Sequence, residues 1–375
     1  MKIAFDLRRI KNPGIGRYMK CLVEAIVVQL PEHEYLLILP PGEESLVDAP
    51  KAKKILPALK YYSVREQVEL PRILQSHKVD LLHSPHFLLP LVRQCPGVAT
   101  IHDVIYLACP QDLPSRIGRT YYKLMMQACS RMATRIITDS EYSKTDIVRY
   151  LHADPDRIEV IYPGVDPVIK RITDAEKLEA VQRKYGIEYD YILCVGIYKP
   201  RKNHAGLLRA FHQFLASGGQ AQLVIAGPMG DGEAELRRLA ETLGIARQVK
   251  FTGFVDEADL PALYSAAQVC VCPSLYEGFG FTVLEAMACG VPVVCSSATS
   301  LPEVAGDAAL YFNPQDEAEL ARALDKVFTD SALRAALIEK GRKNLLRFSW
   351  NKTAAQTMAV YYRALQMPVP GAVFA

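Results

Sequence analysis

The chain has 375 residues, of which 50% are hydrophobic and 23% charged, and its net charge is +3. This length predicts two domains that each bury a core of their own, and the balanced charge gives no reason to expect a nucleic-acid partner. The nine cysteines are scattered without a Cys-x-x-Cys pair, which predicts reduced thiols in a cytoplasmic protein. The N-terminus does not look like a signal peptide, and no apolar run approaches the ~20 residues that span a bilayer.

Short apolar segments alternate with amphipathic helical segments along the whole chain. The expected strands of the first half are 2–5, 35–39, 81–83, 98–102, 135–138 and 159–161, and those of the second half are 191–195, 222–226, 249–252, 269–272, 292–295 and 309–312. The pattern predicts an α/β fold with buried parallel strands in two doubly wound, Rossmann-like domains. Such sheets bind ligands at the carboxyl ends of their strands, so we expect the functional site where loops of both halves converge.

A turn-rich segment, Tyr162-Pro-Gly-Val-Asp-Pro167, interrupts this pattern near the middle of the chain. Helical periodicity resumes at 174–185. We therefore expect an N-terminal domain over 1–164 and a C-terminal domain over 165–350, followed by a segment, 351–375, made of one helix and a loose tail.

The first loop with a chemical signature is 12–18, Asn-Pro-Gly-Ile-Gly-Arg-Tyr, which follows the first strand. It contains Gly14 and Gly16, but it lacks the third glycine of a dinucleotide fingerprint and the Gly-Lys-Ser/Thr of a P-loop. What remains is a loop whose backbone N–H groups can approach an anion, or a plain strand–helix turn.

Histidines follow two strands of the first half. His102 and Asp103 end the strand 98–102, where a histidine lies at the rim of the sheet rather than in the core; the alternative is a structural pair that caps the next segment. His83 and His86 lie at the end of the preceding strand, and a site role for His86 is open. A two-histidine metal site lacks a carboxylate or cysteine partner here and is not expected.

A pair of adjacent cations follows the first strand of the second half. The loop 196–203 reads Gly-Ile-Tyr-Lys-Pro-Arg-Lys-Asn and contains Arg201 and Lys202. Arginine offers a planar fork for phosphate oxygens and lysine a mobile point charge, so the pair could neutralise a leaving diphosphate. The alternative is a pair of solvated cations at a helix start.

The strongest pattern follows the apolar strand 268–272. Glu277 is followed by Gly278, Phe279, Gly280 and Phe281, and then, with seven residues between the two glutamates, by Glu285 in a helix that stops at Gly290. A glycine-bearing loop at a helix start offers free backbone N–H groups, and carboxylates accept hydrogen bonds from hydroxyls. The arrangement favours a polyhydroxylated ligand over two glutamates that merely face solvent.

This run, with 285–294 and 300–305, resembles the E-x7-E signature of retaining glycosyltransferases of family four (group 1), whose GT-B architecture has two Rossmann-like domains facing a central cleft. The resemblance covers nearly the whole chain. It implies a nucleotide-diphosphate sugar as donor, no cofactor and no metal, and a final helix that returns to the first domain. The Gly-Ile-Gly-Arg-Tyr run at 14–18 is similar to that of mannosyl-type enzymes, which favours GDP-mannose, with a UDP-sugar as the alternative.

The resemblance also implies site roles. The implied catalytic residues are His102, Asp103, Glu277, Arg201 and Lys202, and the implied donor-binding residues are Gly14, Gly16, Arg201, Lys202, Gly253, Phe254, Glu277, Gly278, Phe279, Gly280, Phe281 and Glu285. Among them, Glu285 would bind the ribose, Glu277 the sugar, and the Gly253 loop the base. The acceptor would be a glycan, a lipid-linked glycan or a similar hydroxyl. The rival interpretations are a sugar-nucleotide epimerase or phosphorylase on this fold, and an inactive scaffold that binds a membrane or partner.

Two further patterns lie outside that signature. Asp154-Pro-Asp156 spells the Asp-x-Asp of metal-dependent glycosyltransferases, but we expect a turn and cap there. The segment 116–135 is cationic without an acidic residue, with Arg116, Arg119, Lys123, Arg131 and Arg135 expected along one helix. It could make peripheral contact with the inner face of the membrane or could be a solvated face.

Overall fold

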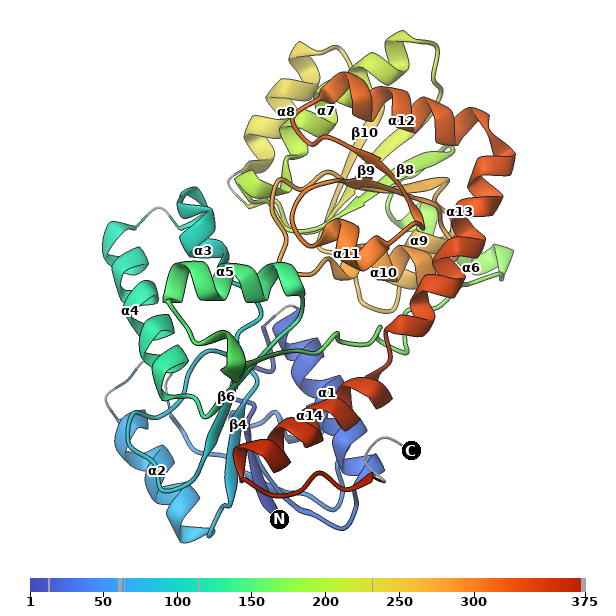
Figure 1. The fold of residues 1–375 in the computed structure, drawn as a ribbon. Helices are drawn as coiled ribbons and strands as arrows, with labels where there is room; N and C mark the ends of the chain where they lie inside the picture. The colour runs from blue at the N-terminus through green and yellow to red at the C-terminus, as the bar shows by residue number, and fades with distance from the viewer. Residues whose placement is uncertain (13, 60–62, 64, 114, 231, 372–375) are drawn as a thin grey trace. The chain divides into compact units, whose positions relative to one another are not determined.

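The computed structural model describes all residues except 13, 60–62, 64, 114, 231 and 372–375, and the chain divides into two compact units (Figure 1). Unit 1 comprises Met1–Gly164 and Phe348–Ala375, and unit 2 comprises Val165–Arg347. Each unit is an α/β fold with a parallel sheet, so the predicted fold class is confirmed.

In the described part of unit 1 the sheet has seven parallel strands in the order β3-β2-β1-β4-β5-β6-β7. They are β1 Lys2–Asp6, β2 Glu34–Ile38, β3 Lys53–Ile55, β4 Leu81–Ser84, β5 Gly97–Thr100, β6 Arg135–Thr138 and β7 Ile158–Val160. The predicted strands lie within two residues of the observed ones at each end. β3 was not predicted, because Lys53-Lys54-Ile55 has no apolar run and lies at the edge of the sheet.

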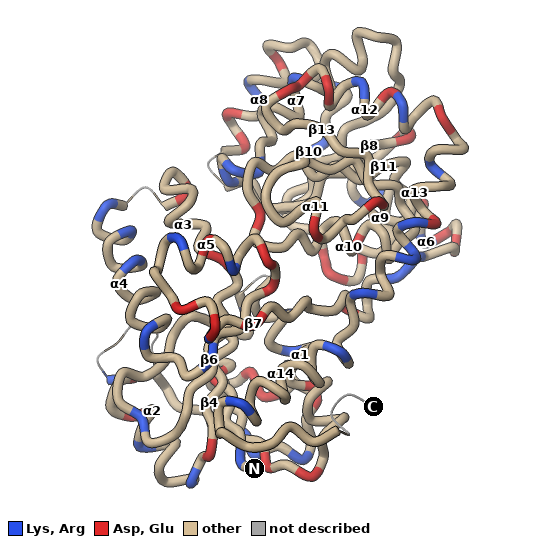
Figure 2. Tube along the Cα trace, in the orientation of Figure 1, with Lys and Arg blue, Asp and Glu red and all other residues tan. Residues whose placement is uncertain are grey.

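The helices of unit 1 connect these strands and cover both faces of the sheet. They are α1 Ile15–Gln29, α2 Glu66–Ser76, α3 Ile105–Ala108, α4 Arg116–Met132, α5 Glu141–Leu151 and α14 Trp350–Ala364. Figure 2 shows lysines and arginines on α4 and no acidic residue. The helix predicted over 116–135 is too long: it ends at Met132, and Arg135 begins β6, where its guanidinium donates to the Asp156 carbonyl at 2.7 Å. Arg135 therefore does not belong to the cationic face of α4.

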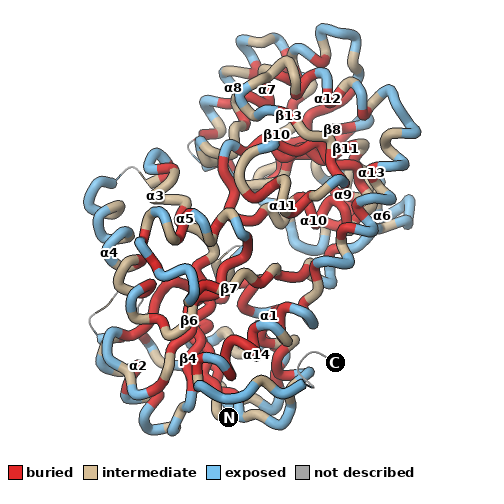
Figure 3. Tube along the Cα trace, in the orientation of Figure 1, coloured by how far each residue is buried: buried red, intermediate tan, exposed pale blue. Residues whose placement is uncertain are grey.

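The α14 helix closes one side of the unit 1 core. It packs against α1, and Tyr361 is fully buried with Trp350 and Tyr362 nearly so. The alternation of β1 divides its side chains between two cores, since Ile3 and Phe5 join the α1–α14 side while Ala4 joins the other. Figure 3 shows the strands buried beneath more exposed helices.

In the described part of unit 2 the sheet has six parallel strands in the order β10-β9-β8-β11-β12-β13. They are β8 Tyr191–Val195, β9 Gln222–Ala226, β10 Val249–Gly253, β11 Val269–Cys272, β12 Val293–Ser296 and β13 Ala309–Phe312. The helices are α6 Ala175–Lys184, α7 His204–Ala216, α8 Gly232–Thr242, α9 Leu260–Ser265, α10 Phe281–Ala288, α11 Leu301–Ala305, α12 Glu317–Thr329 and α13 Ser331–Asn344. Among the described residues, no helix is both long and apolar enough to cross a bilayer.

The strand order reverses direction once in each sheet, between β1 and β4 in unit 1 and between β8 and β11 in unit 2. Loops leave the carboxyl ends of neighbouring strands on opposite sides at such a point, and ligands of doubly wound sheets bind there. Gly14 and the first turn of α1, which contains Gly16, follow β1, and the Arg201 and Glu277 loops follow β8 and β11.

Candidate active site

The reversal point of unit 2 brings three of the predicted site residues into one ion cluster. Lys202 lies in the loop after β8 and places its Nζ 2.5 Å from Oε1 of Glu277, which lies in the loop after β11. The Arg201 Nη1 is 3.4 Å from Oε2 of the same carboxylate, and Ser274 donates its hydroxyl to Oε1 at 2.6 Å. Two cations thus converge on one buried anion.

Glu277 is held as an anion in spite of its burial. Burial alone raises the pKa of the Glu277 carboxyl. Lys202, Arg201 and the Ser274 hydroxyl lower this pKa by more than burial raises it, so the net pKa lies below its usual range. The charged cluster is therefore preformed without a ligand.

The loop after Glu277 is fixed by hydrogen bonds to the neighbouring loop. The Glu277 N–H donates to the Thr299 hydroxyl at 3.0 Å, and the Ser300 hydroxyl reaches the carbonyls of Glu277 and Phe279 at 2.9 and 3.0 Å. Gly280 has φ +110 and caps α10, and a Cβ there would lie 2.7 Å from a Leu301 methyl. Sequence reasoning missed these Ser and Thr partners, because nothing in their spacing ties 299–300 to 277.

The aromatics of the same loop pack against each other. Phe279 is buried and lies against Phe281, with ring centroids 5.1 Å apart. What the segment Gly278–Phe281 offers a ligand is therefore chiefly its backbone at the start of α10.

Glu285 lies one turn into α10 and is also buried. Its Oε2 accepts a hydrogen bond from the Tyr264 hydroxyl of α9 at 2.8 Å. Burial and the Glu285 charge raise the pKa of Tyr264 well above its usual range, so the phenol stays protonated and donates. Tyr264 was not predicted as a partner, because it lies 21 residues away in a separate short helix.

Gly253 is the last residue of β10, and Phe254 follows it. Gly253 has φ +66 and accepts the Gly227 N–H at 2.9 Å, so two strand ends approach closely here. A Cβ on Gly227 would lie 2.5 Å from the Gly196 carbonyl oxygen, which explains the requirement for glycine. Phe254 is 72% exposed, an unusual position for a large apolar ring.

In unit 1 a buried ion cluster lies at the end of β1, and two glycines lie at the start of the next helix. Arg8 donates to Asp6 at 2.7 Å and to Glu66 at 3.1 Å, and all three side chains are almost fully buried. Gly14 has φ +76 and precedes α1, and a Cβ on Gly16 would lie 1.8 Å from the Ile10 carbonyl oxygen. The backbone at this helix start therefore depends on glycine at both positions, by conformation at Gly14 and by close packing at Gly16.

The histidines after β4 and β5 have different environments. His83 is wholly internal: its ring nitrogens lie 2.5 Å from the Tyr361 hydroxyl and 2.9 Å from the Thr100 hydroxyl. Burial, with the neighbouring His102, lowers the pKa of His83 to about 3. His86 is also buried, and its Nδ1 has no hydrogen-bond partner among the described residues.

His102 is paired with a residue that sequence reasoning missed. Its Nδ1 lies 2.7 Å from Oδ2 of Asp139, the residue after β6, and not beside the adjacent Asp103. Asp103 instead accepts the Ile105 N–H at 3.0 Å, at the start of α3. Asp103 thus contacts the backbone at the start of the next helix, as the alternative interpretation of a structural cap predicts. The pair with opposite charges is His102 and Asp139.

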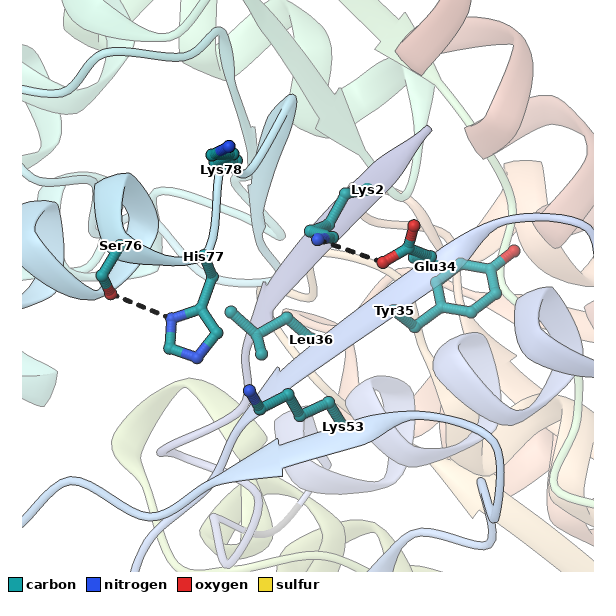
Figure 4. Close-up of a pocket in the computed structure, with 8 residues that line it drawn as sticks. All are labelled: Lys2, Glu34, Tyr35, Leu36, Lys53, Ser76, His77 and Lys78. Atoms are coloured by element: carbon teal, nitrogen blue, oxygen red, sulfur yellow. Dashed lines mark hydrogen bonds and ion pairs between the residues drawn. The ribbon is translucent and has the colours of Figure 1, made fainter.

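A separate hollow of about 350 Å³ lies at the opposite, amino ends of β1, β2 and β3 (Figure 4). Its cations are Lys2, Lys53 and Lys78, and Lys2 is paired with Glu34 at 3.0 Å. His77 accompanies them, with its Nδ1 2.9 Å from the Ile73 carbonyl oxygen. This hollow contains none of the predicted site residues.

Two doubly wound sheets, with a cationic cluster and two buried glutamates at the strand ends of one of them, form the kind of site at which such folds bind nucleotide ligands. Residues 14–168 match the model of "Glycosyltransferase Family 4", and residues 178–344 match "Glycosyl transferases group 1". The chain belongs to this family and is a hexosyltransferase of the GT-B fold.

Relatives and solved structures agree with this assignment. O-antigen chain mannosyltransferase B of Escherichia coli is 32% identical over 381 residues, covering 96% of this chain and 99% of that protein. The E. coli serotype-specific mannosyltransferase WbdA is 34% identical over 274 residues, 72% of this chain and 34% of that protein. Anabaena Alr3699/HepE in complex with UDP-glucose has the same fold, with a TM-score of 0.76 at 20% identity over 97% of this chain and all of that one.

Proposed function

We propose that the protein transfers a hexose, mannose, from a nucleotide-diphosphate sugar to a hydroxyl of a glycan or lipid-linked glycan, with retention of the anomeric configuration. GDP-mannose is the favoured donor and a UDP-sugar the second candidate. The mannosyltransferases among its relatives support the sugar, and the Lys202–Glu277–Arg201 cluster supports the reaction. That cluster is the observation that carries the proposal.

In this proposal unit 2 binds the donor and unit 1 the acceptor. Arg201 and Lys202 neutralise the diphosphate as the glycosidic bond breaks, because preformed charges stabilise a leaving anion without reorganisation. The leaving phosphate oxygen takes the proton of the acceptor hydroxyl, so no separate general base is needed.

The remaining donor contacts follow from the strand ends. Glu277 and the backbone N–H groups after it bind the sugar, and Glu285, fixed by Tyr264, binds the ribose. The loop at Gly253 and Phe254 holds the base. In unit 1, the glycine loop at Gly14 and Gly16 faces the phosphates, and His102 and Asp103 contact the sugar or orient the acceptor.

The test is a thermal-shift screen over GDP-, UDP- and ADP-sugars, followed by NMR of the product's anomeric configuration. A ligand that binds only the folded state raises the free energy of unfolding by mass action, by about 2.7 kcal/mol at a ligand concentration 100 times Kd. The melting temperature Tm rises as a result. GDP-mannose should give the largest shift, and transfer should give an α-mannoside from the α-linked donor. Epimerised sugar nucleotide, phosphate-dependent cleavage, or no shift with any sugar nucleotide would favour the rival functions.

A second proposal concerns α4: we propose that this helix rests on an anionic membrane, at the cytoplasmic face where a lipid-linked acceptor would be met. Its exposed side carries Ile117, Tyr121 and Leu124, which are 85%, 42% and 59% exposed, flanked by the cations Arg116, Lys123 and Arg131. A solvated helix face has no reason to expose three large apolar side chains. Each cation near an anionic surface adds about 1 kcal/mol.

Flotation with phosphatidylglycerol vesicles tests this surface. We expect co-flotation at low salt, loss at high salt by screening, and loss in the variant Leu124→Glu/Lys123→Glu. The matched control is Lys177→Glu on α6 of unit 2, an exposed lysine outside the α4 face. Equal flotation of the α4 variant and the wild type would exclude this face.

A further inference from the structure

His102 lies among groups contributed by three neighbouring elements of unit 1. Asp139 contacts its Nδ1 at 2.7 Å, the Pro85 carbonyl oxygen lies 3.3 Å from its Nε2, and the ring of Tyr18 from α1 meets it edge-on with centroids 4.7 Å apart. The pairing with Asp139 follows from the strand register. Thr100 of β5 is paired with Ile137 of β6, so residues two positions further along each strand come to lie side by side.

The hydrogen-bond geometry requires two N–H groups on this ring. A carboxylate and a carbonyl oxygen only accept hydrogen bonds, and they face the two ring nitrogens of His102. A neutral imidazole has one N–H and would leave one nitrogen lone pair against an acceptor. The doubly protonated imidazolium donates to both. His83 differs, because its two partners are hydroxyls, which can donate to one nitrogen and accept from the other.

The burial of Asp139 leads to the same protonation state. Its side chain is 3% exposed, and its second oxygen, Oδ1, has no hydrogen-bond partner among the described residues. A buried carboxylate without a compensating cation is strongly unfavourable. His102 is the group that compensates it.

We infer that Asp139 is a positioning residue that fixes the His102 ring and keeps it as an imidazolium, so that unit 1 presents a cation and an N–H donor at the carboxyl end of its sheet. This inference rests on the proposed function, in which His102 contacts the sugar nucleotide. The Nε2–H bond to Pro85 is long, at 3.3 Å, so a hydroxyl or phosphate oxygen of a ligand can replace the carbonyl as its acceptor. Asp139 would then act on the ligand only through His102.

The groups that face His102 favour this state. Burial by itself lowers the pKa of His102, but Asp139, through its charge and its hydrogen bond, and then Asp103, raise it, and the net pKa lies above the usual value. Burial and Asp139 raise the pKa of Tyr18, which stays neutral. Burial lowers the pKa values of His83 and His86, and the charge of His102 lowers them as well. Neither ring therefore competes with His102 for its second proton.

The experiment follows the ring nitrogens of His102 by NMR in protein with ¹⁵N-labelled histidine, with His102→Gln used to assign the signal. In the wild type both nitrogens should remain protonated through neutral pH, and in Asp139→Asn, which keeps the shape and removes the charge, the second proton should be lost at lower pH. The matched control is Asp146→Asn, which removes another buried carboxyl of unit 1, on α5. It should leave the His102 titration unchanged.

The kinetic arm separates positioning from a purely structural role. With GDP-mannose, kcat/KM of Asp139→Asn should fall on the alkaline side, by about tenfold per pH unit for one proton, and should recover toward the wild-type value as the pH is lowered. A structural defect would lower it equally at every pH.

Three results would overturn the inference. They are a neutral His102 in the wild type at pH 7, an identical His102 titration in Asp139→Asn, and an unshifted pH profile in an active Asp139→Asn enzyme. The first needs no variant, so it decides the question even if Asp139→Asn does not fold. If the wild type binds and uses no sugar nucleotide while the NMR result holds, the proposed function fails and the imidazolium pair stands.

Discussion

Lys202 has two roles in our interpretation, as the partner of Glu277 in the free protein and as the counter-ion of the diphosphate in the reaction. The two roles predict different outcomes for Lys202→Met and for the double variant with Glu277→Gln. Lys202 and Glu277 are 16% and 9% exposed, and their charged atoms are 2.5 Å apart. They form a nearly buried pair whose partners depend on each other.

The stability of Lys202→Met follows from the anion it leaves behind. Removing one partner of a buried pair costs about 3–5 kcal/mol, and we expect the lower end, because Glu277 keeps the Ser274 hydroxyl and Arg201. For a unit of this size, about 3 kcal/mol lowers Tm by roughly 6–12 °C. In the double variant the neutral amide that replaces the Glu277 carboxylate no longer needs a cation, so most of the stability should return.

Turnover should behave differently. Loss of one preformed contact to developing charge costs about 2.7–4 kcal/mol, or 100- to 1,000-fold in kcat, and this loss should persist in the double variant. The assays are chemical denaturation and turnover at saturating donor. The control is Lys184→Met, whose contacts to Asp256 and Asp259 lie at the surface, where solvent screens them, so its loss should change stability little. Wild-type turnover in Lys202→Met/Glu277→Gln would refute the diphosphate role of Lys202.

Three other predictions concern the same fold. Glu285→Gln should weaken binding of free GDP in calorimetry, by roughly tenfold for a hydrogen bond to a charged group, while Glu277→Gln should mainly harm the sugar-dependent step; the reverse pattern would exchange their roles. Activity should survive EDTA, because Arg201 and Lys202 supply the cations, and a loss restored by Mg²⁺ or Mn²⁺ would contradict this. Finally, the pKa of His83 is lowered to about 3 in the folded chain. Below pH ~6.5 the unfolded chain therefore binds a proton at His83 that the folded chain does not bind. The free energy of unfolding should then fall by about 1.4 kcal/mol per pH unit on acidification. Urea unfolding at pH 7 and pH 5 should show a smaller difference in His83→Gln, and an equal difference would mean that His83 is not held neutral.

Local patterns were sufficient for most of the fold. Apolar runs bounded by turns predicted the buried strands, whose side chains have no polar alternative, and failed at β3, where two lysines occupy a sheet edge. The glycine loops were also predictable, because positive φ restricts the residue type at Gly14 and Gly280.

Partners across the sheet were not predictable from local patterns. His102 was grouped with the adjacent Asp103, although its partner is Asp139, 37 residues later, brought near by the pairing of β5 with β6. Lys202 and Glu277 are 75 residues apart and meet because β8 and β11 are neighbours. Each predicted site residue was visible in the sequence, but its protonation state and its partner depend on strand order, which spacing along the chain does not contain.

The two pairs share a physical logic that bears on the reaction. In each, a charged group at the end of one strand is held by an oppositely charged group at the end of the neighbouring strand, Lys202 by Glu277 and His102 by Asp139. Such a partner holds the cation in place before a ligand arrives, so in the proposed function the site need not reorganise when negative charge develops on the leaving group. The partner also satisfies only part of the cation's donor capacity, since an ammonium has three N–H groups and an imidazolium two. In the proposed function a diphosphate or a sugar hydroxyl takes the other donors, and at His102 it displaces the Pro85 carbonyl from Nε2, so removing the anion and removing the cation should have different consequences at both sites.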